Sequence, residues 1–367
     1  MMQVTSYGGK GFYALPATQA YGGGANAPAS KSGDQRGNDQ ATIVTLSDAA
    51  RAASVEVKFA TVVAAVRETL NTLLSEAGRQ NPLEDGKIAL DMSSLSQREL
   101  FAIAKTDDGL FTCDERKAAE LEMERRLSLA LSGPAGVSDV TGDFRALYKA
   151  AADHFDGLSA EQKAEPAWQA ARNAIDKALI ALNSDPAKFP SKIDGDPVAA
   201  WLASRSSGDI EGEFAGSLVG NLRNILDQRY AAADEAGTRA TFDKKRPGHF
   251  IDLGEFGSRA VSAMALNREG SFSPEEEHAA KSEIRLRANL ALSESYKDAA
   301  RSGDPTAFSR NIIAIYSSMS ADERLAAGIS ENLLSAAISS YESTTRLTDI
   351  MAMGANSMGG MESWFSR

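Results

Sequence analysis

The chain contains one long segment twice: the sequence from Asp91 to Ala174 reappears from Asp252 to Ser335, displaced by a constant 161 positions. Between residues 104–131 and 265–292, eleven of 28 aligned positions are identical without a gap. A repeat of this length indicates two copies of one structural unit. With 367 residues, 43% of them hydrophobic, the chain is long enough for two ordinary domains.

The periodic segments of both copies have a helical pattern. Residues 54–74 carry apolar side chains at helical spacing, and 214–236 is a counterpart at an offset of 155 or 156, in which Arg223 matches Arg67. Further helical patterns lie at 112–131, 166–182, 274–292, 306–316 and 326–341. Strand patterns are short, at 87–92 and 249–253. The sequence therefore predicts an all-α fold of two homologous helical units, with at most a short β-bridge between turn segments.

Composition divides the chain into five parts. Residues 1–40 are rich in Gly, Ala, Ser, Gln and Asn, which predicts a disordered tail. We expect the first helical unit at 41–182, a linker with three prolines at 183–204, and the second unit at 205–346. Residues 347–367 combine methionines, glycines and aromatic residues and predict a flexible tail. Such a tail suits docking to a protein partner, because Met and aromatic side chains adapt to a groove.

Two loops of the repeat resemble degenerate EF-hands. When Gly109 and Gly270 are placed at position 6 of a twelve-residue loop, the loops span 104–115 and 265–276. The resemblance implies weak candidate Ca²⁺ ligands at Asp108, Glu115, Asn267, Glu269 and Glu276. Position 1 of each loop is alanine where the family has aspartate. Each loop then offers about four protein oxygens, fewer than the six to eight that Ca²⁺ takes.

The same residues also fit helix capping without a metal. Ser273 to Glu276 reads as a capping box, with the serine as N-cap and the glutamate at N3, and Thr112 to Glu115 has the same form. The segments 159–162 and 320–323 repeat this form away from any metal-like loop. Phe111 and Phe272 are expected to be core anchors, facing one another across a pseudo-twofold axis. We favour the structural interpretation and keep Ca²⁺ as the alternative; no other cofactor is expected.

Charge and cysteine content exclude several classes. A net charge of -11 argues against a nucleic-acid partner, because an acidic chain is repelled by phosphates. The apolar runs are far shorter than a membrane-spanning helix needs, so we expect no integral membrane segment. Cys113 has no internal partner for a disulfide. No Sec-type signal pattern is present, so we expect a cytoplasmic protein or one exported by a signal-peptide-independent route.

No local motif for catalysis is found. His154, His249 and His278 share no motif, and the matching positions of the other copy hold no histidine. We therefore expect a non-enzymatic helical protein that binds a protein partner or acts as a scaffold. A calcium-responsive regulator using the two loops, and a hydrolase built around His249 and Asp252, are alternatives. Residues 45–50 are similar to a short segment near the start of bacterial flagellar-associated proteins, which implies a bacterial, flagellar-associated or secreted protein.

Overall fold

The computed structural model describes residues 58–207 and 218–358, so the predicted tail at 1–40 lies outside the described residues. We call residues 58–207 the first half and residues 218–358 the second half. The first half contains helices α2 (Phe59–Glu76), α3 (Gln97–Lys105), α4 (Cys113–Thr141), α5 (Arg145–Asp156), α6 (Ala160–Lys163), α7 (Pro166–Ser184) and α8 (Pro197–Ser207). The second half contains α9 (Leu218–Glu235), the 3-10 helix η1 (Leu253–Glu255), α10 (Ser258–Leu266), α11 (Pro274–Ser302), α12 (Ala307–Ser318), α13 (Ala321–Ala327) and α14 (Glu331–Met358). The all-α prediction is confirmed.

Among the described residues, strands occur only in two small sheets, in keeping with the predicted all-α class. Strands β1 (Leu83–Glu84) and β2 (Lys87–Ile88) pair antiparallel in the first half. Strands β3 (Ala240–Thr241) and β4 (His249–Phe250) pair parallel in the second. Each sheet therefore stays within its own half and does not bridge the two.

Three pairs of corresponding helices have equal lengths in the two halves, whereas α6 and α7 are shorter than α13 and α14. Helices α3 and α10 have nine residues each, α4 and α11 have 29, and α5 and α12 have 12. Helices α4 and α11 extend about ten residues beyond the predicted ends at 131 and 292, and each ends at a left-handed glycine, Gly142 or Gly303. A glycine in this conformation is the usual C-terminal stop of a helix, because a Cβ would be strained there.

The pattern predicted as one helix over 326–341 is divided between α13 and α14. Gly328 ends α13 in the left-handed conformation, and the amide of Ile329 donates to the carbonyl of Arg324 at 2.9 Å. This bond satisfies one of the last carbonyls of α13, and the chain turns at Gly328 before α14 begins.

Two ranges differ from the expected linker and tail. Helix α8 lies largely within 183–204, and Val198 and Trp201 are buried in a cluster with α4, α5 and α7. Pro197 starts this helix, which is where proline is tolerated because its missing N–H has no helical partner. Helix α14 continues through 347–358, a range rich in helix-forming Met, Ala and Leu. Only 359–367 of that predicted tail lies outside the described residues.

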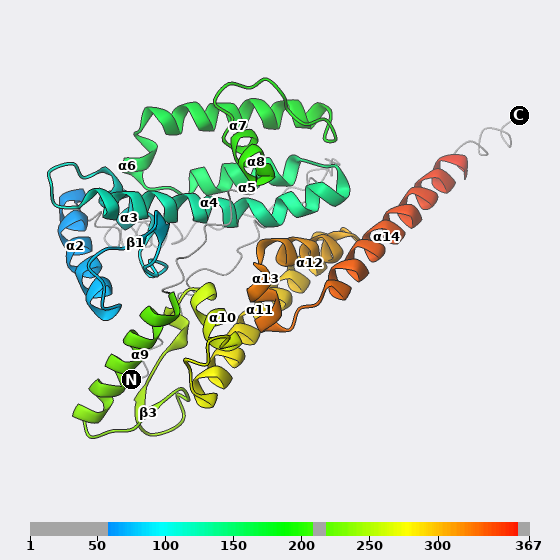
Figure 1. Cartoon of the computed structure of the whole chain (residues 1–367). Coiled ribbons are helices and arrows are strands. Elements are labelled where there is room, and N and C mark those ends of the chain that lie inside the picture. The colour runs from blue at the N-terminus through cyan, green and yellow to red at the C-terminus, as the bar shows by residue number, and fades with distance from the viewer. Residues whose placement is uncertain (1–57, 208–217, 359–367) are drawn as a thin grey trace, which may run out of the picture.

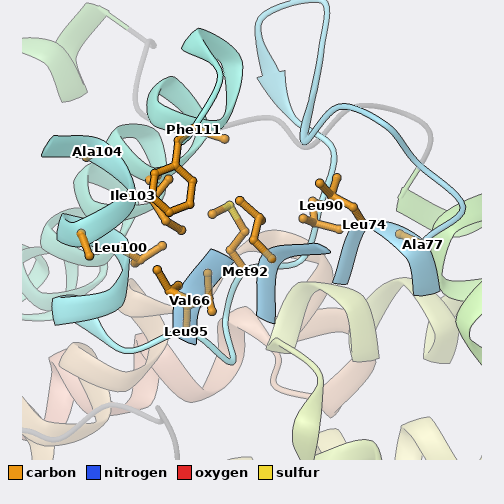
Figure 2. Packing of buried hydrophobic residues seen from close by; sticks show 14 residues of the cluster. Val66, Leu74, Ala77, Leu90, Met92, Leu95, Leu100, Ile103, Ala104 and Phe111 are labelled. Carbon is orange, nitrogen blue, oxygen red and sulfur yellow. The ribbon is translucent and has the colours of Figure 1, made fainter. Parts of the chain in front are cut away.

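Four apolar clusters form the core. The first, shown in Figure 2, packs α2 against α3, the start of α4 and the loop that holds Leu90 and Met92. A second joins α9, η1, α10, α11 and Ala326 of α13, and a third joins the end of α4 to α5, α7 and α8. Phe111 and Phe272 are both buried, as expected of core anchors, but they belong to different clusters and do not face one another.

The fourth cluster joins the two halves, because α4 packs against α12, and α12 in turn packs against α14. Val137 of α4 lies among Ile313 of α12 and Ala337 of α14. Glycine permits the close approach: a Cβ at Gly133 would lie 2.8 Å from the backbone oxygen of Ala314. Figure 1 shows α12 running beneath α4, with α14 leaving the body at this end. Within the described residues no helix is long and apolar enough to cross a membrane.

Candidate functional site

The loop before α4 is hydrogen-bonded to a buried glutamate in the first turn of that helix. Thr112 is the N-cap of α4, and its side chain accepts from the amide of Glu115, whose carboxylate accepts from the amide of Thr112 at 2.8 Å. The capping box predicted from the sequence is therefore present. Glu115 is 4% exposed, so its charge needs a partner.

Arg67 of α2 supplies that partner. Its Nη1 and Nη2 atoms each donate to one oxygen of Glu115 at 2.8 Å. The guanidinium also lies 5.1 Å from the ring centre of Phe111, so the loop's aromatic anchor packs against the ion pair. Burial raises the pKa of Glu115, but the hydrogen bonds from Arg67 and Thr112 outweigh it and hold the pKa below its usual value. Glu115 is therefore charged and bound on both oxygens.

The second half repeats this arrangement. Ser273 caps α11 in a capping box with Glu276, which is 1% exposed. Arg223 of α9 donates to both oxygens of Glu276 at 2.9 Å. Burial raises the pKa of Glu276, but the hydrogen bonds from Ser273 and Arg223 outweigh burial. The pKa of Glu276 is therefore lower than its usual value. Burial and the neighbouring Glu276 carboxylate raise the pKa of Tyr230.

The other three predicted ligands do not converge on these glutamates. Asp108 is exposed and accepts from the amide of Leu110 at 3.0 Å, which makes a local turn. Asn267 ends α10 in a left-handed conformation. Its side-chain nitrogen donates to the carbonyl of Phe272, and its side-chain oxygen accepts from the amide of Phe272. Glu269 is exposed. Over residues 58–207 and 218–358, no group of three or more His, Cys, Asp or Glu side chains is placed to hold a metal ion.

The three histidines lie on separate elements: His154 on α5, His249 on β4 and His278 on α11. His249 and His278 are exposed. Asp252, the suggested partner of His249, accepts from the amide of Gly254 at 2.9 Å and pairs with Lys244 at 3.3 Å. These contacts make a turn at the start of η1.

A cavity of about 590 Å³ lies between the two halves. The equivalent loops 91–96 and 254–257 line it, together with residues of α4, α10 and α12. Asp91 of the first half forms a hydrogen bond to the second half. Its Oδ1 accepts from the amide of Ser93 in its own loop at 3.0 Å, and its Oδ2 accepts from the amide of Gly257 in the second half at 2.8 Å. The volume and the position between two units are typical of ligand sites.

Three arginines that line this cavity donate hydrogen bonds to other groups of the protein. Arg126 donates to a backbone carbonyl of the loop 91–96 at 2.7 Å, and Arg287 donates to a backbone carbonyl of η1 at 2.8 Å. Arg125 binds Glu122 through two bonds of 2.7 and 2.8 Å. These three arginines are therefore bound to other groups of the protein.

The distal part of α14 is the described surface with the most exposed apolar residues on one helix. Figure 1 shows α14 projecting from the body, in orange and red. Its exposed large apolar side chains are Leu347 (57%), Ile350 (65%), Met351 (71%) and Met353 (72%). Single exposed apolar residues are ordinary, but four on one projecting segment make it the candidate contact surface of the described chain.

Sequence reasoning paired Arg67 with Arg223 but did not assign them to Glu115 and Glu276. The signal for that assignment was their equivalent placement in both copies of the repeat. The cavity and the projecting helix had no local sequence signal, because both depend on how the halves pack.

The chain matches no known protein family, no curated protein and no solved structure.

Proposed function

We propose that this chain is a non-enzymatic, helical protein that binds a protein partner or acts as a scaffold, and that the distal part of α14 is its contact surface. The observation that supports this function is the exposure of Leu347, Ile350, Met351 and Met353 on a helix that projects from the body. Residues at i, i+3 and i+4 of a helix, here 347, 350 and 351, are the pattern by which a helix enters a partner's groove.

A photo-crosslinking residue at position 350 tests this function in an extract of the source cells. The control carries the same group at Thr348, which is exposed on another side of α14. We expect position 350 to give discrete protein adducts that position 348 does not give. Equal labelling from both positions would reject α14 as the contact surface.

We infer that the two halves arose by duplication of one unit. The equal lengths of α3 and α10, of α4 and α11 and of α5 and α12, and the repeated Arg–Glu pair at α2/α4 and α9/α11, support this inference. Superposing residues 91–141 on 252–302 in an experimental structure tests it: a best fit in any register other than the 161-residue offset contradicts duplication.

We place the action of the protein in the cytoplasm or, by a signal-peptide-independent route, outside it. The support is the amino-acid composition of residues 1–40. Fractionation of source cells with an antibody to the chain distinguishes the two compartments, and recovery in a membrane fraction resistant to high salt would contradict both.

A further inference from the structure

The cavity between the two halves is lined by charges of both signs that cancel. Four arginines and four acidic residues line it. Apolar wall comes from Leu129 and Pro134 of α4 and from Ala314 of α12. Because a bound molecule should match the charge and the polarity of its walls, this cavity favours a ligand that has an apolar part and no net charge.

Glu323 brings a buried carboxylate oxygen that is open to such a ligand. It is 5% exposed, lines the cavity and belongs to the capping box that begins α13. Its Oε2 accepts from the amide of Ser320 at 2.7 Å. Within residues 58–207 and 218–358, no group donates to its Oε1. A buried carboxylate is costly while one oxygen lacks a donor, so Oε1 favours an N–H donor inside the cavity.

Arg125 of α4 offers the complementary donor from the first half. Its Nε and Nη2 donate to the two oxygens of Glu122 at 2.7 and 2.8 Å, whereas its Nη1 donates to no group of the described chain. Burial lowers the pKa of Arg125, but nearby carboxylates, Glu122 first and Glu323 among them, raise it by more. Arg125 therefore lies within electrostatic range of Glu323, although the two side chains form no ion pair with one another in the described structure.

A proline in α4 adds a second acceptor to the wall. Pro134 lies inside this helix and has no N–H. The carbonyl of Ala130, four residues earlier, therefore lacks its usual helical donor. Ala130 and Pro134 both line the cavity, so a donor inside the cavity can supply the missing hydrogen bond.

We propose that this cavity binds a small zwitterion with an apolar side chain, that is, a free apolar amino acid or a short apolar peptide. Its ammonium group donates to Glu323 and to the carbonyl of Ala130, and its carboxylate accepts from Nη1 of Arg125. The two charges of the ligand cancel, as those of the wall do. The volume of about 590 Å³ lies within the range of about 300 to 1,000 Å³ of small-molecule sites. This site shares no residue with the distal part of α14.

Thermal unfolding of the full chain with added zwitterions tests the site. We expect L-leucine, L-phenylalanine or L-leucyl-L-leucine at about 10 mM to raise the melting temperature, because a ligand of the folded chain stabilises it. Two analogues of leucine each lack one charge: 4-methylpentanoic acid has no ammonium group, and 3-methylbutylamine has no carboxylate. Neither should raise the melting temperature. A rise with the amino acids alone identifies a free amino acid as the ligand, and a rise with the dipeptide alone identifies a peptide.

The variant Glu323→Gln tests the residue assigned to the ammonium group. Glutamine keeps the capping box, because Gln162 forms the same box at the equivalent position of the first half. Isothermal titration calorimetry should show an affinity for the zwitterion that is lower by about 10- to 100-fold. The matched control Asp322→Asn removes a carboxylate that lies on the same helix, is 50% exposed and does not line the cavity. Its affinity should equal that of the wild type.

The variant Arg125→Leu tests the residue assigned to the carboxylate group. Glu122 keeps its bond to Arg126 at 2.9 Å in this variant, so its buried charge retains a partner. We expect a loss of affinity of the same size, about 10- to 100-fold. Circular dichroism checks that each variant is folded.

Three results would overturn the inference. The first is a wild-type melting temperature that none of the three zwitterions raises. The second is an equal rise with leucine and with either single-charge analogue, which would indicate apolar binding alone. The third is full affinity in Glu323→Gln or Arg125→Leu. If a variant does not fold, the comparison of leucine with its two analogues on the wild-type chain still decides the question.

Discussion

The buried pair Arg67–Glu115 should contribute more to stability than its counterpart Arg223–Glu276. The test replaces each glutamate with glutamine, which keeps the shape and the capping bond but removes the charge. Besides the neutral glutamine oxygen, Arg67 would retain the side-chain oxygen of Asn71, at 2.6 Å, and a backbone carbonyl, none of which is charged. Arg223 would retain a carboxylate, because Asp227 lies 2.8 Å away. The loss of charge therefore leaves Arg67 with the poorer set of partners.

The magnitude follows from burial. Breaking a fully buried ion pair costs about 3 to 5 kcal/mol. Because Arg67 is 17% exposed and glutamine keeps one bond, we expect Glu115→Gln to lower the free energy of unfolding by about 2 to 4 kcal/mol. For Glu276→Gln we expect about 1 to 2 kcal/mol, since Asp227 offsets part of the loss.

Urea unfolding followed by circular dichroism at pH 7 measures both changes. The matched control is Glu99→Gln in the capping box of α3, where the glutamate accepts from the amide of Ser96 at 2.6 Å; we expect this change to cost about 0.5 to 1 kcal/mol. The folded-state pKa of Glu115 is lowered, so its contribution is complete above the unfolded pKa of 4.5 and is lost as pH falls through the folded value. A cost for Glu115→Gln no greater than that of Glu99→Gln, or smaller than that of Glu276→Gln, would refute the reasoning.

Three further predictions concern other parts of the fold. Ca²⁺ at about 1 mM should leave the melting temperature of the chelator-treated chain unchanged, because arginines bind both oxygens of Glu115 and Glu276. A rise in melting temperature that Glu276→Gln abolishes would instead support the calcium hypothesis. Gly133→Ala should destabilise by about 1 to 3 kcal/mol, because its Cβ would meet the backbone of α12, whereas Gly220→Ala, which meets nothing within 4 Å, should stabilise by up to about 1 kcal/mol; equal effects in urea would contradict the close packing. Burial, together with the charge of Arg126, lowers the pKa of His154, so the folded chain should lose stability as pH falls below about 6.5. In unfolding experiments at several pH values, His154→Gln should weaken this pH dependence, whereas the control His278→Gln, at an exposed residue, should leave it unchanged.

Local chemistry was predictable from the sequence to a useful depth. The four capping boxes, at 112–115, 159–162, 273–276 and 320–323, are all present, because the side chain and amide that form each one are three residues apart. The helical class and the short strands at 87–88 and 249–250 followed from periodicity in the same way.

The parts that sequence reasoning missed depend on distant contacts. Prolines at 186, 190 and 197 suggested a linker, but Trp201 inserts into the cluster beside α4 and so fixes α8 against the first half. Similarly, Glu115 looked like a ligand or a cap, and its main partner, Arg67, lies 48 residues away. No local pattern contains either contact, because each forms only when the helices pack.

The glycine contact between α4 and α12 has a consequence for a chain that is cut into its two halves. Each half supplies one face of that contact, so a chain cleaved between residues 207 and 218 would leave α4 and α12 each with an uncovered apolar side. Such fragments should recombine into a native-like complex when mixed. By the same logic, neither half could be deleted without exposing the apolar surface that the other half covers.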